Sequence, residues 1–381
     1  MTALRPSEVA ARLARHSLRP VVAQPPAGTV SLAIGEPDFD TPDVIVAAAV
    51  EALRCGETHY VDQNGLPELR TVLASQLTAL AGAAYEPNQV AVTHGATAAL
   101  AASVLAVVNA GDRVVIPEPC YSLYGDLVHL AGGVPIFVPA RDDLHWDLDA
   151  LRVATRGARL VIYSNPCNPT GVVHSAVELA VLGEMLAGTE TLVIADEAYH
   201  AIVYDRDTFT STLSIESLRD RTVYVQTLSK TYAMTGWRIG YVAGPAEVIA
   251  AASRIHRTFN GSLNAAVQRA GLTALSHGVA LAAPMLEEYR KRRAVFFERL
   301  AEIPDLAARM PDGTFYAFAR YRRQVSSTEF AHRLRDAGVQ VRAGIEYGRT
   351  GEGHVRFSFA SDIATIHQAM DRVTSCLATW S

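Results

Sequence analysis

The sequence predicts an α/β fold, in which a large domain with a seven-stranded, mostly parallel sheet is joined to a smaller α+β domain. Between residues 90 and 245, short β-branched apolar runs alternate with longer apolar-periodic stretches, which is typical of parallel strands joined by helical crossovers. From residue 284 the pattern changes to one charged helix followed by short strands. The length of 381 residues suits two unequal domains, because domains usually span about 100–200 residues.

The strands of the large domain are expected where the apolar runs are richest in β-branched residues. These runs are Val90–Thr93, Arg113–Pro117, Val134–Val138, Leu160–Ser164, Leu192–Asp196, Val223–Thr227 and Ile239–Ala243. Helical crossovers are expected over segments such as Thr97–Val108 and Ala176–Ala187, where apolar residues recur with helical spacing.

The smaller domain is expected to begin with a helix over Leu286–Arg299. Its strands are expected around Gly313–Ala319, Val339–Arg342 and His354–Phe359. The predicted organisation is an N-terminal segment (1–45) that packs with the small domain, a large domain (46–283) and a small domain (284–381).

The composition indicates an ordinary globular protein that binds small molecules. Hydrophobic residues make up 49% and charged residues 19%, and the net charge of −5 lacks the basic surplus of nucleic-acid-binding proteins. No apolar stretch approaches the roughly 20 residues of a membrane span, and no apolar signal core follows the N-terminal arginines. A cytoplasmic location without membrane association is therefore expected. The cysteines are far apart and the histidines lack paired spacing, so neither a disulfide framework nor a metal site is predicted.

Polar residues follow five of the expected strands directly. In open α/β sheets, ligands bind beyond the carboxyl ends of the strands. The segments in these positions are Gly95–Thr97, Cys120–Tyr121, Asn165–Asn168, Asp196–Tyr199 and Ser229–Lys230.

Lys230 is the most informative of these residues. A lysine amine forms a Schiff base with an aldehyde, and the nearby hydroxyls of Thr227 and Ser229 and the guanidinium of Arg238 are groups that bind a phosphate. This combination suggests the cofactor pyridoxal 5′-phosphate (PLP), although a Ser-Lys-Thr run on its own is more often a solvated loop.

The segment Gly95-Ala96-Thr97 has the pattern of a strand, a glycine turn and the start of a helix. Backbone N–H groups at Ala96 and Thr97 would then point outward from the positive end of a helix dipole and could bind a phosphate. An ordinary strand-to-helix turn is the alternative.

The segment Asn165–Gly171 contains two Asn-Pro pairs just after a buried strand. Each proline restricts the residue before it, so the amide of Asn168 would be fixed in place and could hydrogen-bond a phenolate oxygen. The alternative is a simple turn rich in asparagine, proline and glycine.

Asp196 ends an apolar strand, where an unpaired carboxylate would be costly. A protonated pyridine nitrogen would be a suitable partner, and Tyr199 could reach the 3-oxygen of the same ring. A helix-capping aspartate is the alternative.

Together these motifs resemble the class I/II aminotransferases, which are fold-type I PLP-dependent enzymes. The resemblance rests on Asn-Pro-x-Asn-Pro-Thr-Gly, Asp-Glu-x-Tyr, Ser-Lys-Thr-Tyr-Ala-Met-Thr-Gly-Trp-Arg and the terminal Val-Arg-Phe-Ser-Phe-Ala, in order from Leu32 to Phe359. It implies that Lys230 forms the internal aldimine and moves the proton, while Asp196 partners the pyridine nitrogen. It also implies that Asn168 and Tyr199 contact the 3-oxygen and that Tyr121 stacks on the ring. The implied phosphate contacts are Gly95, Ala96, Thr97, Thr227 or Ser229, and Arg238.

The resemblance also implies substrate contacts and a homodimer. Alternation in Val355–Phe359 puts Arg356 and Ser358 on one face, where Arg356 would bind the α-carboxylate with two parallel hydrogen bonds. On the pattern alone, a solvated arginine is the alternative. Gly35 belongs to a segment that closes over the substrate, and Asn168 would also contact it. Tyr60 matches a tyrosine that reaches the phosphate of the neighbouring subunit, so the active sites would be shared between subunits.

The expected reaction is transfer of the α-amino group of an L-amino acid to a 2-oxo acid. A PLP-dependent β-lyase or another amino-acid-modifying enzyme is the main alternative, because the same cofactor stabilises any Cα carbanion. A PLP-sensing regulator is not expected, because no helix-turn-helix precedes Leu32–Phe39. Two departures from the family pattern concern the substrate. Thr97 stands where aspartate-using members tend to have a lysine, which removes one anchor for a second carboxylate. The segment before the last glycine turn places two unusual charges, those of Arg342 and Glu346, near the expected substrate mouth, although a surface position is the favoured explanation for them.

Overall fold

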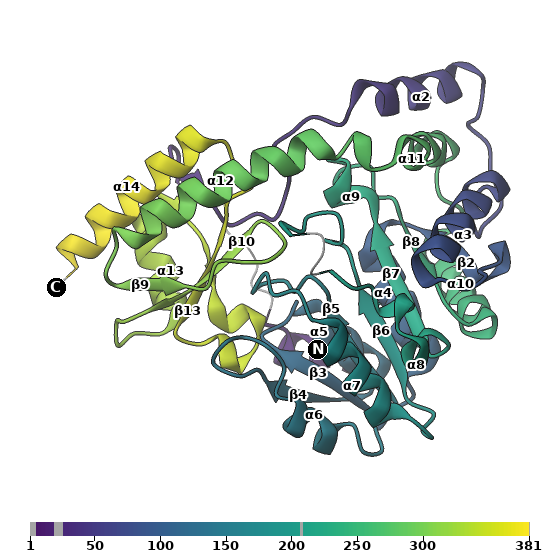
Figure 1. Cartoon of the computed structure of the whole chain (residues 1–381), viewed down its shortest axis with the longest axis horizontal. Helices are drawn as coiled ribbons and strands as arrows, with labels where there is room; N and C mark the ends of the chain where they lie inside the picture. Colours follow the sequence, from purple (N-terminus) through teal and green to yellow (C-terminus); the bar gives the residue numbers. More distant parts are fainter. Residues whose placement is uncertain (1–4, 19–25, 206–208, 381) are drawn as a thin grey trace.

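The computed structural model describes residues 5–18, 26–205 and 209–380, and its helices surround two main sheets (Figure 1). The larger sheet has seven strands in the order β2-β8-β7-β6-β5-β3-β4. Only β8 runs antiparallel to its neighbours, β2 and β7, so the predicted mostly parallel sheet is confirmed. The strand bounds are β2 Val90–Thr93, β3 Arg113–Glu118, β4 Val134–Pro139, β5 Leu160–Ser164, β6 Leu192–Asp196, β7 Thr222–Thr227 and β8 Gly240–Ala243.

Helices cover both faces of this sheet, which is why its central strands are apolar throughout. In β5, Val161 packs in the same core cluster as residues of α7, whereas the next residue, Ile162, packs with residues of α4 and α5. The helices around this sheet are α2 Asp43–Arg54, α3 Pro67–Ala81, α4 Gly95–Val107, α5 Leu123–Ala131, α6 Leu148–Ala154, α7 Ala176–Leu186, α8 Glu216–Arg219, α9 Leu228–Thr231, α10 Ala246–Asn260 and α11 Ala265–His277.

The smaller sheet is antiparallel, with strands in the order β12-β13-β10-β9. Its strands are β9 Leu306–Ala308, β10 Tyr316–Tyr321, β12 Arg342–Ala343 and β13 His354–Ser358. Helices α12 and α14 pack together beside this sheet (Figure 1), and the predicted charged helix lies within α12. The helices of this part are α12 Ala283–Ala301, α13 Ser327–Asp336 and α14 Ile363–Thr379.

The N-terminal segment contacts both parts of the molecule. Strand β1 (Val30–Ser31) pairs in parallel with β11 (Val339–Gln340) of the smaller part. Helix α1 (Glu8–His16) packs instead on α5, where Arg12 donates a hydrogen bond to the carbonyl oxygen of His129 at 3.2 Å. Residues 1–4 and 19–25 of the predicted 1–45 segment lie outside the described residues. The domain boundaries after residues 45 and 283 stay predictions.

Short 3₁₀ turns complete the described chain: η1 Pro87–Gln89, η3 Thr212–Ser214, η4 Gly278–Ala280, η5 Gly344–Tyr347 and η6 Arg349–Gly351. Within the described ranges, no helix has both the length and the apolar character needed to span a membrane.

Candidate active site

A cavity of about 770 Å³ lies where the carboxyl ends of β5, β6 and β7 face the smaller sheet. This placement follows from the topology, because the ends of parallel strands meet at one edge of the sheet. Twelve of the residues predicted from sequence line it: Gly35, Ala96, Thr97, Tyr121, Asn168, Asp196, Tyr199, Thr227, Ser229, Lys230, Arg238 and Arg356. Of the remaining predicted residues, Gly95 lies directly behind Arg238 in the cavity wall, and Tyr60 lies at a separate hollow.

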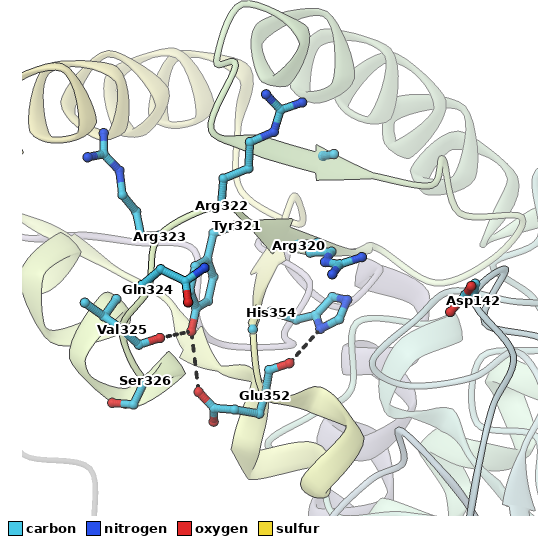
Figure 2. A pocket seen from close by; sticks show the side chains of 12 residues that line it. Asp142, Arg320, Tyr321, Arg322, Arg323, Gln324, Val325, Ser326, Glu352 and His354 are labelled. Carbon is cyan, nitrogen blue, oxygen red and sulfur yellow. Dashed lines mark hydrogen bonds between the residues drawn. The ribbon is translucent and has the colours of Figure 1, made fainter.

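A second hollow, of about 930 Å³, is lined mostly by residues of the smaller part of the molecule, together with Asp142, which follows β4 (Figure 2). Its arginines Arg320, Arg322 and Arg323 point in different directions rather than toward a common point. Arg323 is already paired with Asp305 at 2.5 Å. The cavity at the strand ends is therefore the better candidate for a site that binds a specific ligand.

Lys230 lies in the single turn of helix α9, directly after β7. Its Nζ donates a hydrogen bond to the carbonyl oxygen of Gly35 at 2.5 Å. Burial lowers the pKa of Lys230 to about 8, which increases the fraction of neutral amine near neutral pH. The sequence contains just one other lysine, Lys291, which is exposed and pairs with Glu288 at 3.6 Å.

Asp196 ends β6 with its carboxylate buried in the cavity wall. Tyr124 donates a hydrogen bond to Oδ2 at 2.8 Å, and the N–H of Ala198 donates to Oδ1 at 3.2 Å. Burial raises the pKa of Asp196 to about 6, because no cation among the described residues contacts the carboxylate directly to offset the loss of solvation. The helix-capping alternative is wrong, since residues 198–201 form a turn rather than a helix.

The N-terminus of α4 forms another wall, with Ala96 and Thr97 in its first turn facing the cavity. Gly95 has a φ of +73°, and a Cβ atom there would lie 2.7 Å from Nη2 of Arg238. Arg238 itself has a φ of +57°, which is unusual for a residue other than glycine. Glycine is therefore required at position 95, so that the guanidinium of Arg238 can lie against the helix N-terminus.

The hydroxyls beside Lys230 have different surroundings. Thr227 caps helix α9 by accepting a hydrogen bond from the N–H of Ser229, and its Oγ1 also lies 3.0 Å from the carbonyl oxygen of Ile239. Oγ1 of Thr227 donates to the hydroxyl of Ser229 at 2.8 Å. Thr227 therefore holds the local turn, and Ser229 is the better placed of the two to bind a ligand.

Arg356 is buried, with 6% of its surface exposed, so the alternative of a solvated arginine is wrong. It donates hydrogen bonds to Oδ1 of Asn168 at 2.9 Å and to the carbonyl oxygen of Ala33 at 2.6 Å. The guanidinium carbon lies 4.0 Å from the ring centre of Tyr316 and 5.0 Å from that of Tyr347. Its Nε is buried without a hydrogen-bond partner among the described residues, which leaves a donor for a ligand.

Tyr199 also lies in this wall, and its hydroxyl is 2.7 Å from the hydroxyl of Tyr316. Sequence reasoning missed Tyr316, Tyr347 and Tyr124, because their contacts join residues far apart in the chain. A Cβ atom on Gly35 would overlap the hydroxyl of Tyr316, at 1.6 Å. Glycine at position 35 thus allows the N-terminal segment to lie against this tyrosine.

The expectation that Arg342 and Glu346 lie at the surface is wrong. Both line the cavity, and Nε of Arg342 lies 2.6 Å from Oε2 of Glu346. Exposed fractions of 23% for the Arg342 side chain and 13% for that of Glu346 place the pair in the cavity wall. The segment folds inward because β12 pairs with β13, which a local pattern does not reveal.

Tyr60 lies outside the cavity and is 98% exposed. It borders a separate hollow together with His59 and His94.

One group of possible metal ligands lies away from the cavity, although no metal was predicted. Within the described residues, His145, His174 and Glu178 bring their ligand atoms within 4.8 Å of one another. Glu178 also accepts hydrogen bonds from the N–H and hydroxyl of Ser175, the residue that caps α7. The spacing of His174 and Glu178, four residues apart, is the sequence signal that could have indicated this contact.

Comparisons with known proteins agree with this geometry. The chain matches the aminotransferase class I and II family over residues 27–373. It is 36% identical over 352 residues to a putative aminotransferase of Bacillus subtilis, with 91% of each chain covered. It is also 36% identical, over 357 residues and 91% of each chain, to an aspartate aminotransferase of Pyrococcus abyssi.

The fold also matches that of a solved structure. The crystal structure of the aromatic aminotransferase of Pyrococcus horikoshii has a TM-score of 0.90 and 34% identity, covering 97% of this chain and 98% of that chain. This chain therefore belongs to the class I and II aminotransferase family of PLP-dependent, fold-type I enzymes.

Proposed function

We propose that the protein transfers the α-amino group of an L-amino acid to a 2-oxo acid, with Lys230 moving the proton at the substrate Cα. The observation that carries this proposal is the position of Lys230, whose amine shares one cavity with the carboxylate of Asp196 and the guanidinium of Arg356. An amine with a pKa of about 8 is well suited to act as a base near neutral pH.

The residues of the cavity fit PLP. Asp196 is a buried carboxylate that no cation of the described ranges contacts directly, as expected for a partner of a protonated pyridine nitrogen. The first turn of α4, Ser229 and Arg238 form a phosphate-binding corner from backbone N–H groups, a hydroxyl and a guanidinium. When bound, PLP accepts the electrons of the broken Cα bond into its ring.

The remaining roles follow from the donors that the cavity offers. Asn168 and Tyr199 would hydrogen-bond the 3-oxygen of the cofactor, and Tyr121 would lie against its ring. Arg356 would bind the α-carboxylate, because its planar fork suits two parallel hydrogen bonds and its Nε is still unpaired. Gly35, at the mouth, would let the N-terminal segment approach the substrate.

Nitrogen transfer can be followed directly with an isotope. An amino acid labelled with ¹⁵N at its α-amino group and a 2-oxo acid should yield a new amino acid that carries the label. Label appearing in ammonium instead, with the labelled substrate consumed, would identify a lyase and reject the transferase proposal.

We further infer that the active unit is a homodimer with shared sites. Exposed apolar side chains lie on α2, namely Val44, Val46, Val50 and Leu53, and Tyr60 and Phe259 are also exposed. Apolar surface of this kind is favourable to cover with a second subunit. Tyr60 would then reach the phosphate in the partner's cavity.

Hybrid dimers test this arrangement. When Tyr60→Phe and Lys230→Ala subunits are mixed and allowed to exchange, one site of each hybrid should contain neither substitution, and activity should exceed the sum of the parents. Strictly additive activity after demonstrated exchange would mean that Tyr60 serves its own subunit or no site.

A cytoplasmic location completes the proposal. All four cysteines are free thiols, as expected in a reducing compartment. The relatives named above carry different names, aspartate aminotransferase in one case and aromatic aminotransferase in another, so they do not identify the substrate of this chain.

A further inference from the structure

Two arginines oppose each other in the wall of the cavity. Arg342 of β12 and Arg356 of β13 are register partners on antiparallel strands, and both line the cavity. Directly opposed side chains stand on the same face of a sheet about 4.5–5.5 Å apart at Cβ, and like charges in such positions destabilise the pair. An unfavourable local choice of this kind is typical of functional sites.

Glu346 compensates for only one of these positive charges. Its Oε2 lies 2.6 Å from Nε of Arg342, and its Oε1 accepts a hydrogen bond from the N–H of Ala343 at 3.3 Å. The side chain of Glu346 is 13% exposed, so this ion pair is largely withdrawn from water. Glu346 therefore neutralises Arg342, and Arg356 is left for the α-carboxylate of the substrate.

The ion pair still has hydrogen-bonding capacity. The two terminal nitrogens of Arg342 make no hydrogen bond to any residue that the structure describes. A carboxylate has about four acceptor positions. Among the described residues, that of Glu346 accepts a hydrogen bond from the N–H of Ala343, whereas its Oε2 is buried without a hydrogen-bond partner. The cavity thus presents a donor and an acceptor side by side, beside the position expected for the α-carboxylate.

The charge balance selects among substrate side chains. A second carboxylate would face Glu346, and an ammonium or guanidinium would face Arg342 and Arg356. An apolar side chain would leave the free donors of Arg342 and the free acceptors of Glu346 without partners, which is costly. A carboxamide carries no charge, and it can accept from Arg342 with its oxygen while donating to Glu346 with its nitrogen.

We infer that Arg342 and Glu346 together determine side-chain specificity and select a carboxamide, so that asparagine or glutamine is the preferred amino donor. This inference rests on the proposed aminotransferase function. It assigns substrate recognition to two residues outside the motifs that carry the cofactor.

The first test compares matched substrates on the wild-type holoenzyme. The rate of cofactor conversion should be at least about tenfold higher with an amide than with its matched acid, in one of two pairs: asparagine against aspartate, or glutamine against glutamate. Leucine and lysine should convert the cofactor more slowly than the better of the two amides does. Equal or faster conversion with the acids, leucine or lysine would overturn the inference. If no amino acid converts the cofactor at all, the aminotransferase proposal itself fails, and this inference fails with it.

Charge substitutions provide the second test. Glu346→Gln leaves Arg342 without its counter-ion, so the amide-to-acid rate ratio should fall and the acid should become the better substrate. Arg342→Gln leaves Glu346 unpaired, so the acids should react still more slowly and lysine should improve. The control Glu329→Gln removes the acid of an exposed pair with Arg333 on α13, and its ratio should equal that of the wild type. A ratio that does not respond to either cavity substitution would contradict the inference.

A binding measurement covers the case in which the variants do not fold. Succinamate, the monoamide of succinate, should bind the wild-type holoenzyme at least about tenfold more tightly than succinate does. Tighter binding of succinate would show that Arg342 acts as a carboxylate site and would reject the carboxamide assignment.

Discussion

Lys230→Ala is expected to abolish turnover, with a loss of at least about a thousandfold, because both the covalent attachment of the cofactor and the proton transfer at Cα are assigned to this amine. The variant should still bind PLP, since it leaves the proposed phosphate-binding corner of α4, Ser229 and Arg238 unchanged. Steady-state rates and the absorbance of the purified protein measure the two effects separately.

Lys291→Ala is a matched control, because Lys291 is the other lysine of the chain and lies exposed on α12. It should retain the rate and the spectrum of the wild type. Borohydride reduction followed by peptide mapping should find the cofactor on Lys230, and recovery of the label on Lys291 would refute the assignment.

The burial of Lys230 also predicts a pH dependence of stability in the cofactor-free protein. The folded-state pKa of about 8 lies below the ordinary lysine value of 10.5, so the stability contributed by this group is complete above about 10.5 and is lost as the pH falls through about 8. Relative to Lys230→Met, the wild type should therefore gain roughly 3 kcal/mol of unfolding free energy as the pH rises across this range. A difference that is independent of pH would mean that the amine is not desolvated.

Asp196→Ala is expected to slow Cα proton removal by on the order of a hundredfold to a thousandfold, because the ring nitrogen would lose the carboxylate that holds its proton. Asp196→Asn should lower the rate similarly, since it keeps a hydrogen-bond acceptor near Tyr124 but removes the charge. Single-turnover rates with a substrate deuterated at Cα report this step directly.

Glu197→Gln is the control for loss of a buried acid at the same strand end. Glu197 accepts a hydrogen bond from the N–H of Thr212 at 2.7 Å and does not line the cavity, and burial raises its pKa to about 7. We expect this variant to lose stability and to keep the rate of proton removal. If Asp196→Ala instead retained full activity with only reduced stability, the carboxylate of Asp196 would have a structural role alone.

The central strands of the large sheet could be predicted almost to the residue because they are buried on both faces. Leu160–Ser164 and Leu192–Asp196 coincide with β5 and β6, since helices cover both sides of these strands and leave no polar alternation. The residues that follow them, such as Asn168 and Asp196, converge in one cavity because the strands are parallel. Prediction of the site thus depended on local patterns and one topological rule.

The residues that could not be predicted take their positions from pairings between distant segments. Arg342 faces the cavity only because β12 lies in register with β13, and Tyr316 reaches Tyr199 across 117 residues of sequence. The charge and hydrophobic pattern of one segment does not show which distant segment it will pair with. The same reason explains why the packing of α1 on α5 was not anticipated from sequence.

The measurement that tests the central claim most directly is a half-reaction without an acceptor. When the holoenzyme is given an amino acid alone, the nitrogen should remain on the cofactor, so one equivalent of pyridoxamine phosphate should form per site and the reaction should stop. Addition of a 2-oxo acid should restore the original absorbance and release a new amino acid. Sustained release of ammonia without any 2-oxo acid, with no accumulation of pyridoxamine phosphate, would contradict the account.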